Sequence, residues 1–396
     1  MACASASPPP GGAEDHAPPR LISVKPDSNA VNVRERIVTF QFDETINDRG
    51  SGAQELDNYF LVSPSDGSPR VSWHRNRIEI RPRNGFRDNT AYTVTLLPGL
   101  SDLRGNTTHA GANIVFSTGP TIPPDRIRGT VFDWIGERPV ARALVQAVTP
   151  DSVLYLAQSD SVGQFTVGPL PPGSYLVRAI IDANNNRALD RSEQFDTARV
   201  TVPQPQPQKL ELRTIARDTL PPRIASVTVS DSLSLRVTFD RYLDPDQPPP
   251  ATAFRLVAAD SSVVPVLAVI TPRAEQAELV ARAQAVTDSL RRADSLAGKP
   301  LLPRAAAPST TARKPGAVAT PSAPPPYTAL LVRIARPLAP SATYRLSVNA
   351  ARALSGRADA SERSFTTPRA TPPPAADSTR RAAPVPPAAR PAPVRP

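Results

Sequence analysis

The chain has 396 residues, a formal net charge of +10 at pH 7, and 49 prolines against 18 glycines, so it exceeds one ordinary domain and favours about three modest domains with proline-rich connectors. One cysteine excludes an internal disulfide and a multi-cysteine metal cluster, and the absence of an apolar run of about 18 residues excludes a membrane-spanning helix. The basic residues are spread along the chain, which argues against a nucleic-acid-binding face.

Residues 1–18 are expected to form a disordered tether, because the opening "MACASASPPPGGAEDHAPPR" is rich in serine, proline and glycine. This opening resembles the start of a mature bacterial lipoprotein, in which a small residue precedes a lipidated cysteine. The resemblance implies that Cys3 carries a lipid anchor. Only Met1 and Ala2 precede it, so the usual apolar signal segment would have to lie upstream of Met1. The alternative is an incidental thiol in a disordered tail.

Residues 19–120 show the period of two that is typical of half-buried strands. Apolar Val38, Phe40 and Phe42 alternate with polar neighbours, and the turn signals "PSDGSP", "RNGFRDN" and "LRGN" interrupt the pattern. Short strands separated by such turns predict an all-β sandwich of about 100 residues. The alternation recurs at Ile78, Ile80, Tyr92, Val94 and Leu96.

This region resembles the bacterial Ig-like domain of the S-layer and adhesin (SbsA-like) type. A proline entry, a strand with two phenylalanines, a "T-x-Y-x-V" strand, a "D-x-x-G-N" turn and a closing "F-x-T" strand carry the resemblance. It implies a structural or adhesive sandwich at a cell surface. The matching residues are Pro26, Phe40, Phe42, Thr90, Tyr92, Asp102, Gly105, Asn106, Phe116 and Thr118.

Residues 125–204 predict a different β-sandwich, centred on "LAQSDSVGQFTVGPLPPGSYLVRAIID". Gly163 permits a hairpin turn, Phe165 and Val167 fill the core, and Pro-Pro-Gly reverses the chain. The region resembles the carboxypeptidase regulatory-like, or prealbumin-like, sandwich, which implies an accessory domain without catalysis of its own. The matching residues are Gly129, Val131, Asp160, Gly163, Phe165, Leu170, Pro172, Gly173, Tyr175 and Val177.

The stretch "IDANNNRALDRSEQFD" near the end of this region has the oxygen spacing of a calcium loop. Its ligands would be the side chains of Asp182, Asn184, Asn186, Asp190 and Glu193 with the carbonyl of Ala188. Arg187 stands where such loops prefer glycine, and the flanking segment "SYLVRAII" predicts a strand rather than a helix. The alternative is a turn between strands, in which asparagine side chains cap their own backbone.

Residues 218–368 repeat the pattern of the first sandwich, from a proline pair through "LRVTFDR" to a closing "SFTT". We therefore predict a second Ig-like sandwich, although it lacks the Asp and Asn that flank the glycine of the "D-x-x-G-N" turn. The retained residues are Phe239, Asp240, Leu243, Thr343, Tyr344, Gly356, Phe365 and Thr367.

Residues 271–326 interrupt this second copy, and residues 369–396 form a Pro/Ala/Arg-rich tail that we expect to be disordered. The first half of the insertion predicts a short helix with a shallow apolar face, and the second half is low-complexity coil. The helix could dock on a partner or be a solvated insertion. Its apolar face would comprise Leu279, Ala283, Val286, Leu290 and Ala293.

Catalytic patterns are missing from the sequence. His16 lies in the expected disordered tether, His74 on an expected exposed strand edge, and His109 in a loop without a partner in the local sequence. There is no nucleophile elbow, phosphate loop, HExxH or dinucleotide motif. The sequence therefore predicts no enzyme and no cofactor other than calcium. Trp73 and Trp134 are candidates for glycan stacking, but aromatics are only 5% of the chain and most should fill cores.

Together these features predict a non-enzymatic scaffold or adhesive protein of the bacterial cell envelope. It would be tethered as an outer-membrane lipoprotein, or lie in the periplasm or at the surface, and would meet the membrane through its lipid anchor only. Its expected partner is an envelope protein or a cell-wall polymer, and not a nucleic acid. The alternatives are a glycan- or peptidoglycan-binding module and an accessory subunit of a secreted enzyme.

Overall fold

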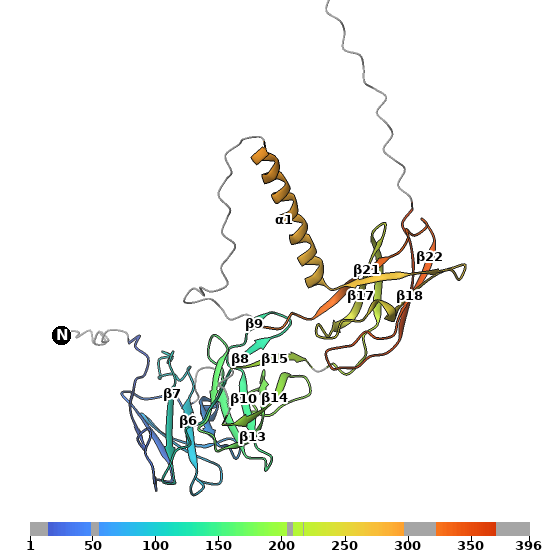
Figure 1. The fold of residues 1–396 in the computed structure, drawn as a ribbon. Coiled ribbons are helices and arrows are strands. Elements are labelled where there is room, and N and C mark those ends of the chain that lie inside the picture. The colour runs from blue at the N-terminus through green and yellow to red at the C-terminus, as the bar shows by residue number, and fades with distance from the viewer. Residues whose placement is uncertain (1–14, 49–54, 204–208, 217, 297–321, 370–396) are drawn as a thin grey trace, which may run out of the picture. The chain divides into compact units, whose positions relative to one another are not determined.

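The computed structural model describes residues 15–48, 55–203, 209–216, 218–296 and 322–369 (Figure 1). The chain divides into two compact units. The first comprises Met1–Leu220 with Asp244–Asp246 and Val286–Pro326, and the second comprises Pro221–Leu243, Gln247–Ala285 and Tyr327–Pro396. The fold class is all-β, as the alternating pattern predicted, with one α-helix among the described residues.

The first unit begins with a sandwich of two antiparallel sheets. One sheet has the order β1 (Leu21–Lys25), β2 (Val38–Phe42), β5 (Arg77–Arg81) and β4 (Arg70–His74). The other has the order β3 (Phe60–Ser63), β6 (Ala91–Leu96) and β7 (Ala112–Ser117), and a 3-10 turn η1 (Leu56–Tyr59) leads into β3. The predicted inward residues of β2, β5 and β6 are at most 3% exposed, so the period of two identified the core correctly.

The middle sandwich completes the first unit. It contains β8 (Ile127–Asp133), β9 (Arg138–Pro139), β10 (Leu144–Val148), β11 (Leu154–Gln158), β12 (Gln164–Val167), β13 (Gly173–Ile180), β14 (Gln194–Val202) and β15 (Leu210–Ala216). The strand order is β11-β10-β13-β14-β15-β8-β12, with β9 paired to β8. Because β15 pairs with both β14 and β8, this sandwich extends past residue 204, where we expected it to end.

Gly129 shows why one of the matching positions in β8 requires glycine. A Cβ at this position would lie 2.2 Å from the carbonyl oxygen of Leu210 and 2.6 Å from the ring of Phe165. The close approach of β15 and of the Phe165 ring therefore depends on the missing side chain.

The second unit is a sandwich whose strands follow the order of the first sandwich, with β19 added at the edge of its second sheet. One sheet has the order β16 (Ile224–Asp231), β17 (Ser234–Leu243), β21 (Tyr327–Ile334) and β20 (Val266–Ile270). The other has the order β19 (Val263–Val264), β18 (Phe254–Ala258), β22 (Thr343–Val348) and β23 (Ser361–Thr366). A 3-10 turn η2 (Ala251–Ala253) leads into β18, as η1 leads into β3.

The likeness of the two sandwiches extends to side-chain hydrogen bonds. The hydroxyl of Tyr92 accepts from the backbone of Arg87 at 2.8 Å, and that of Tyr344 accepts from Ala339 at 3.0 Å, five residues upstream in both cases. Thr118 Oγ1 donates to the carbonyl of Arg87 at 2.6 Å, while Thr367 Oγ1 donates to that of Ala339 at 2.6 Å. The two sandwiches thus share these hydrogen bonds as well as most of their strand order.

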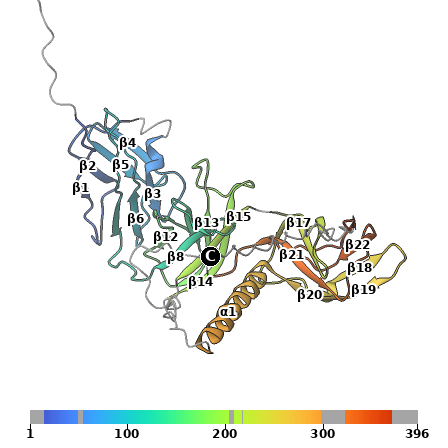
Figure 2. The ribbon, with the colours of Figure 1, turned by 90° about the horizontal axis from the view of Figure 1, so that it is seen from above.

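Helix α1 (Pro272–Leu296) starts directly after β20 and lies within the predicted insertion (Figure 2). Glu275 forms an ion pair of 2.7 Å with Arg236 on β17, and Glu278 pairs with Arg333 on β21 at 2.5 Å, so its first turns are fastened to the sheet. The predicted apolar face is nevertheless solvent-exposed, at Leu279 (59%) and at Val286 (58%). The predicted face residues Leu290 and Ala293 have side chains outside the described part of the structure. Among the described residues, no helix combines the length and apolar character needed to cross a membrane.

Candidate functional site

The predicted calcium loop connects β13 to β14, which pair antiparallel up to Ile180 and Phe195. Asp182 follows the end of β13, and Glu193 directly precedes β14. Glu193 is 6% exposed, and its two carboxylate oxygens accept the backbone N–H groups of Ala183 at 3.1 Å and Asp190 at 3.0 Å. This carboxylate therefore ties the two ends of the loop together.

Within the loop, polar side chains cap the backbone. Asp182 accepts the N–H groups of Asn186 at 3.2 Å and Arg187 at 2.9 Å. Asn184 Oδ1 accepts from Asn186 at 3.1 Å, and Asn186 Oδ1 accepts from Ala188 at 2.8 Å. These are the contacts that an asparagine turn requires.

The left-handed conformations also fit such a turn, with a φ of 56° at Asn185 and 61° at Arg187. Three of the candidate ligands converge on one another: the side-chain amides of Asn184 and Asn186 both donate to Asp190 Oδ2, at 2.8 and 3.0 Å. Calcium takes oxygen ligands, so both amide groups would have to turn their oxygens inward to hold it.

The guanidinium of Arg187 reaches the first sandwich. Its Nη2 donates to the carbonyls of Asp57 at 2.7 Å and Phe60 at 3.0 Å, in the first sandwich. Burial lowers the pKa of Arg187, against the opposing charges of Asp57 and Asp182. The side chain that sequence reasoning took as unfavourable for calcium is thus a contact between two sandwiches of the same unit.

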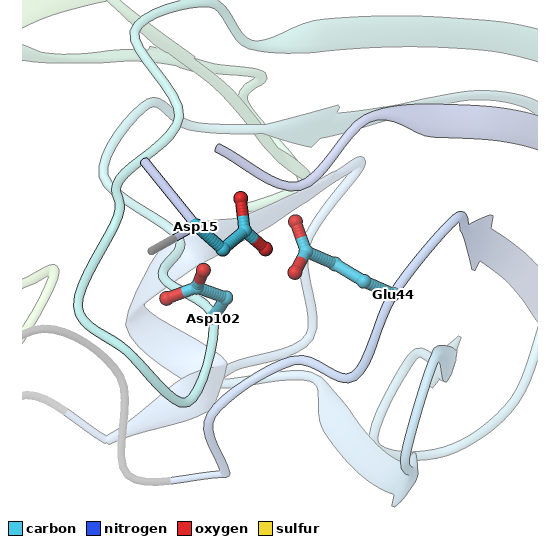
Figure 3. Close-up of side chains that lie close together, drawn as sticks. All are labelled: Asp15, Glu44 and Asp102. Atoms are coloured by element: carbon cyan, nitrogen blue, oxygen red, sulfur yellow. The ribbon is translucent and has the colours of Figure 1, made fainter. Parts of the chain in front are cut away.

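A second acidic group was missed by the sequence analysis. In the described part of the chain, Asp15, Glu44 and Asp102 are the carboxylates that come within 4.8 Å of one another (Figure 3). Burial would raise the pKa of Asp102, but hydrogen bonds from Asn106, Arg104 and Gly105 outweigh it and lower the pKa. Burial, followed by the charges of Asp102, Asp15 and Asp43, raises the pKa of Glu44.

The role of Asp102 is visible in its contacts. Its Oδ1 accepts the N–H groups of Arg104 and Asn106, both at 2.8 Å, so the "D-x-x-G-N" motif closes a turn. The second sandwich forms the matching turn between Ala353 and Arg357 through backbone hydrogen bonds alone. The signal for the acidic group was therefore this motif, but the approach of Asp15 and Glu44 is a tertiary contact.

The two tryptophans differ in exposure. Trp73, on β4, is 38% exposed, and its indole N–H donates to the carbonyl of Ile46 at 2.9 Å. Trp134, in the middle sandwich, is 9% exposed, and the guanidinium of Arg213 lies 4.5 Å from its ring centroid. Stacking on a sugar needs an open ring face, which Trp134 does not offer. The structure thus corrects the expectation for this residue.

A groove of about 750 Å³ lies between the first and middle sandwiches. Threonines of β6 and arginines of the middle sandwich line it, among them Thr93, Thr95, Arg128 and Arg142. The carboxylate in its lining, Asp160, accepts the N–H groups of Val162 at 3.0 Å and Gln164 at 2.8 Å. Asp160 therefore serves a turn of the hairpin.

Other candidate residues are placed as follows. The described residues do not include Cys3, the first 14 residues of the expected tether (1–18) or the tail from residue 370. His74 forms a 3.6 Å contact with Glu79 of the adjacent strand, on the exposed edge of its sheet. His109 lies in an exposed loop between β6 and β7.

Comparison with known proteins finds a family that matches the first sandwich. Residues 15–118 match the family described as a bacterial Ig-like domain. No curated protein matches the chain.

Solved structures give weaker likenesses. The N-terminal part of the bacterial S-layer protein SbsC is 14% identical over 50% of this chain, with a TM-score of 0.19. An L,D-transpeptidase from Mycobacterium smegmatis is 15% identical over 50% of this chain and 77% of its own length, with a TM-score of 0.19. The TIE protein of Bacillus anthracis is 13% identical over 65% of this chain and 48% of its own, with a TM-score of 0.18. The chain spans 43% of the SbsC structure, and TM-scores this low support no statement about function.

Proposed function

We propose that the chain is a non-catalytic scaffold of the bacterial cell envelope or surface, built from two copies of an Ig-like domain around an accessory sandwich. The observation that carries the proposal is the match of residues 15–118 to the bacterial Ig-like domain. The second sandwich supports it, because its sheets repeat the strand order of the first. Fold alone does not determine function, so the proposal needs a test in cells.

The firm junction within the first unit supports a spacing role. The edge strands β3 and β11 meet, with the N–H of Ser65 donating to the carbonyl of Leu154 at 2.7 Å and the N–H of Leu156 donating to Ser63 Oγ at 2.9 Å. Thr93 Oγ1 donates to the carbonyl of Gly168 at 3.0 Å, and Arg187 adds its two contacts. Pairing covers edges that would otherwise be open to other chains and fixes the spacing between the two sandwiches.

The localisation test uses the gene with its natural upstream sequence. We expect the protein in the membrane fraction, accessible to protease on intact or outer-membrane-permeabilised cells, and labelled by an alkyne-bearing fatty acid. Cys3→Ser should abolish labelling and release the protein from the membrane, while the incidental-thiol alternative leaves both unchanged. Recovery of the wild-type protein in the cytoplasm would contradict the envelope proposal as a whole.

Glycan recognition is the alternative function, and Trp73 is its one exposed tryptophan among the described residues. A pull-down with purified cell-wall and outer-membrane fractions distinguishes glycan recognition from the scaffold role. Saturable binding that Trp73→Ala abolishes would favour recognition, whereas equal retention of wild type and variant supports the scaffold.

A further inference from the structure

The outer face of the middle sandwich carries buried aromatic residues. Val131 points into the core, so Phe132, the next residue of β8, lies on the opposite face. Phe132 is nevertheless 2% exposed, and Trp134, which follows the strand, is 9% exposed. Other residues must therefore cover this face.

Residues 322–326, with the sequence Ser-Ala-Pro-Pro-Pro, supply part of that cover. The indole N–H of Trp134 donates to the carbonyl of Pro324 at 3.0 Å. Two residues earlier, the N–H of Ser322 donates to both carboxylate oxygens of Glu211, at 3.1 and 3.0 Å. These contacts join the segment to the residue that follows β8 and to β15, within one compact unit.

Arg213 completes the surface. Its guanidinium lies 4.5 Å from the Trp134 ring centroid, and its Nε is 4.0 Å from Glu211 Oε1. Stacking on the ring and this ion pair hold the side chain, and Nη1 makes no hydrogen bond among the described residues. The three side chains thus form one contiguous set of an aromatic ring, a cation and an anion.

The prolines hold residues 322–326 in an extended conformation even before the segment binds to this surface. Ala323, Pro324 and Pro325 each precede a proline, which disfavours the helical region and restricts them to extended conformations. A proline-rich stretch adopts the polyproline II helix, whose carbonyls make no internal hydrogen bonds and are free to accept others. Proteins that recognise such helices use aromatic grooves and gain from the low entropy of the preformed ligand.

We propose that Trp134, Glu211 and Arg213 form a binding site for extended proline-rich peptides, and that the chain fills this site with its own residues 322–326. The indole N–H donates to a proline carbonyl, and the Glu211 carboxylate accepts the N–H group two residues earlier. A segment on the same chain competes at an effective concentration on the order of millimolar, so an external peptide binds well only when the internal one is removed. The site does not depend on the envelope function proposed above.

The test uses the full chain with Trp73→Phe, which leaves Trp134 as the single tryptophan. Replacing Pro324, Pro325 and Pro326 together by glycine keeps the carbonyls but removes the preformed helix. We expect a red shift of Trp134 emission and severalfold greater quenching by acrylamide. The same triple replacement at Pro372–Pro374, the proline triplet of the tail, is the matched control and should change neither signal.

A synthetic peptide of residues 321–327, PSAPPPY, is then added to both proteins. It should restore the blue-shifted emission of the triple-glycine variant saturably and alter the control only weakly. Unchanged Trp134 emission in the triple-glycine variant, or failure of the peptide to bind it, would overturn the proposal. A peptide in which glycine replaces the three prolines is the specificity control, and equal binding of it would also overturn the proposal.

Hydrogen exchange provides a second readout if the triple-glycine variant folds poorly. In the wild type, the Ser322 amide should exchange slowly because it donates to Glu211. Glu211→Ala should raise its exchange rate severalfold while the amides of β8 keep their protection. Rapid exchange at Ser322 in the wild type would contradict a filled site.

Discussion

At the scale of single residues, buried hydroxyl and guanidinium groups hold backbone segments that no regular hydrogen-bond ladder reaches. Tyr175 donates to the carbonyl of Pro171 at 2.6 Å, across the Pro-Pro-Gly reversal that precedes β13. Arg187 donates to two carbonyls of the first sandwich. Such groups contribute through satisfied backbone acceptors, and removing them leaves those acceptors unpaired.

Tyr175 should make stability decrease in alkaline solution. Burial, followed by the charges of Tyr155, Asp151 and Asp125, raises the pKa of Tyr175 to about 12, whereas an unfolded tyrosine titrates at about 10. The native state holds the proton more tightly, so this contribution is fully present below about pH 10 and is lost as the pH rises through about 12.

We expect Tyr175→Phe to be less stable than wild type by about 1 kcal/mol at neutral pH, because one hydrogen bond is lost. The difference in unfolding free energy between wild type and variant should narrow above the pKa of unfolded tyrosine, since the variant lacks the titrating group. Urea unfolding at several alkaline pH values measures this, and a gap that stays constant with pH would rule out the linkage.

Arg187→Met should destabilise the first unit by about 2 kcal/mol, because two hydrogen bonds from a charged donor are lost and the carbonyls of Asp57 and Phe60 lose their donor. Methionine fills a similar space without charge. Arg191→Met, an exposed arginine in the same loop, is the matched control. Equal stability of the two variants in urea unfolding would show that the desolvation cost of the guanidinium cancels its hydrogen bonds.

At the scale of elements, the loop between β13 and β14 satisfies its own polar groups. Asp182, Asn184, Asn186 and Glu193 each accept a backbone N–H group, which explains why a segment so rich in polar residues keeps one conformation. The calcium hypothesis stays a prediction, since these oxygens are also the candidate ligands.

A weak calcium site in this loop would have a dissociation constant of about 0.1 to 1 mM, as in extracellular modules. In that case millimolar calcium should raise the melting temperature of the wild type relative to a chelator-treated sample, and Asp182→Ala should abolish the shift. Magnesium at the same concentration is the control for ionic strength. No calcium-dependent shift in the wild type would leave the loop with its turn-forming role alone.

At the scale of the whole molecule, the core of the second unit is separate from those of the first. Buried residues of the first and middle sandwiches form clusters that share no member with the cluster of the second unit. Chains with several cores need not unfold in a single step, because each core can be lost separately.

We therefore expect two thermal transitions. Phe40→Ala should lower the midpoint temperature of one transition and Leu346→Ala that of the other. Each substitution should reduce the unfolding free energy of its own unit by about 2 to 5 kcal/mol, because both side chains are fully buried. Scanning calorimetry of the full chain measures both. A single transition that both variants shift equally would mean that the two units unfold together.

The amino-acid sequence by itself determined the fold class and the core, because alternation of apolar residues reports which side of a strand is buried. It also pointed to the shared topology of the first and last sandwiches, since the paired Tyr92 and Tyr344, with Thr118 and Thr367, stand at matching places in the two copies. It did not predict β15, whose apolar residues lie beyond the stretch that carried the resemblance.

The tertiary structure alone decided which side chains meet. The loop spacing predicts that Arg187 opposes calcium binding, yet its guanidinium contacts a neighbouring sandwich. The sequence leaves Trp134 as a candidate for glycan stacking, yet the Arg213 guanidinium lies over its ring and its indole N–H donates to Pro324. Asp15, Glu44 and Asp102 come together from segments far apart in the chain. The physical reason is that periodicity encodes burial within one element, whereas contacts between distant segments depend on how packed elements bring their loops together.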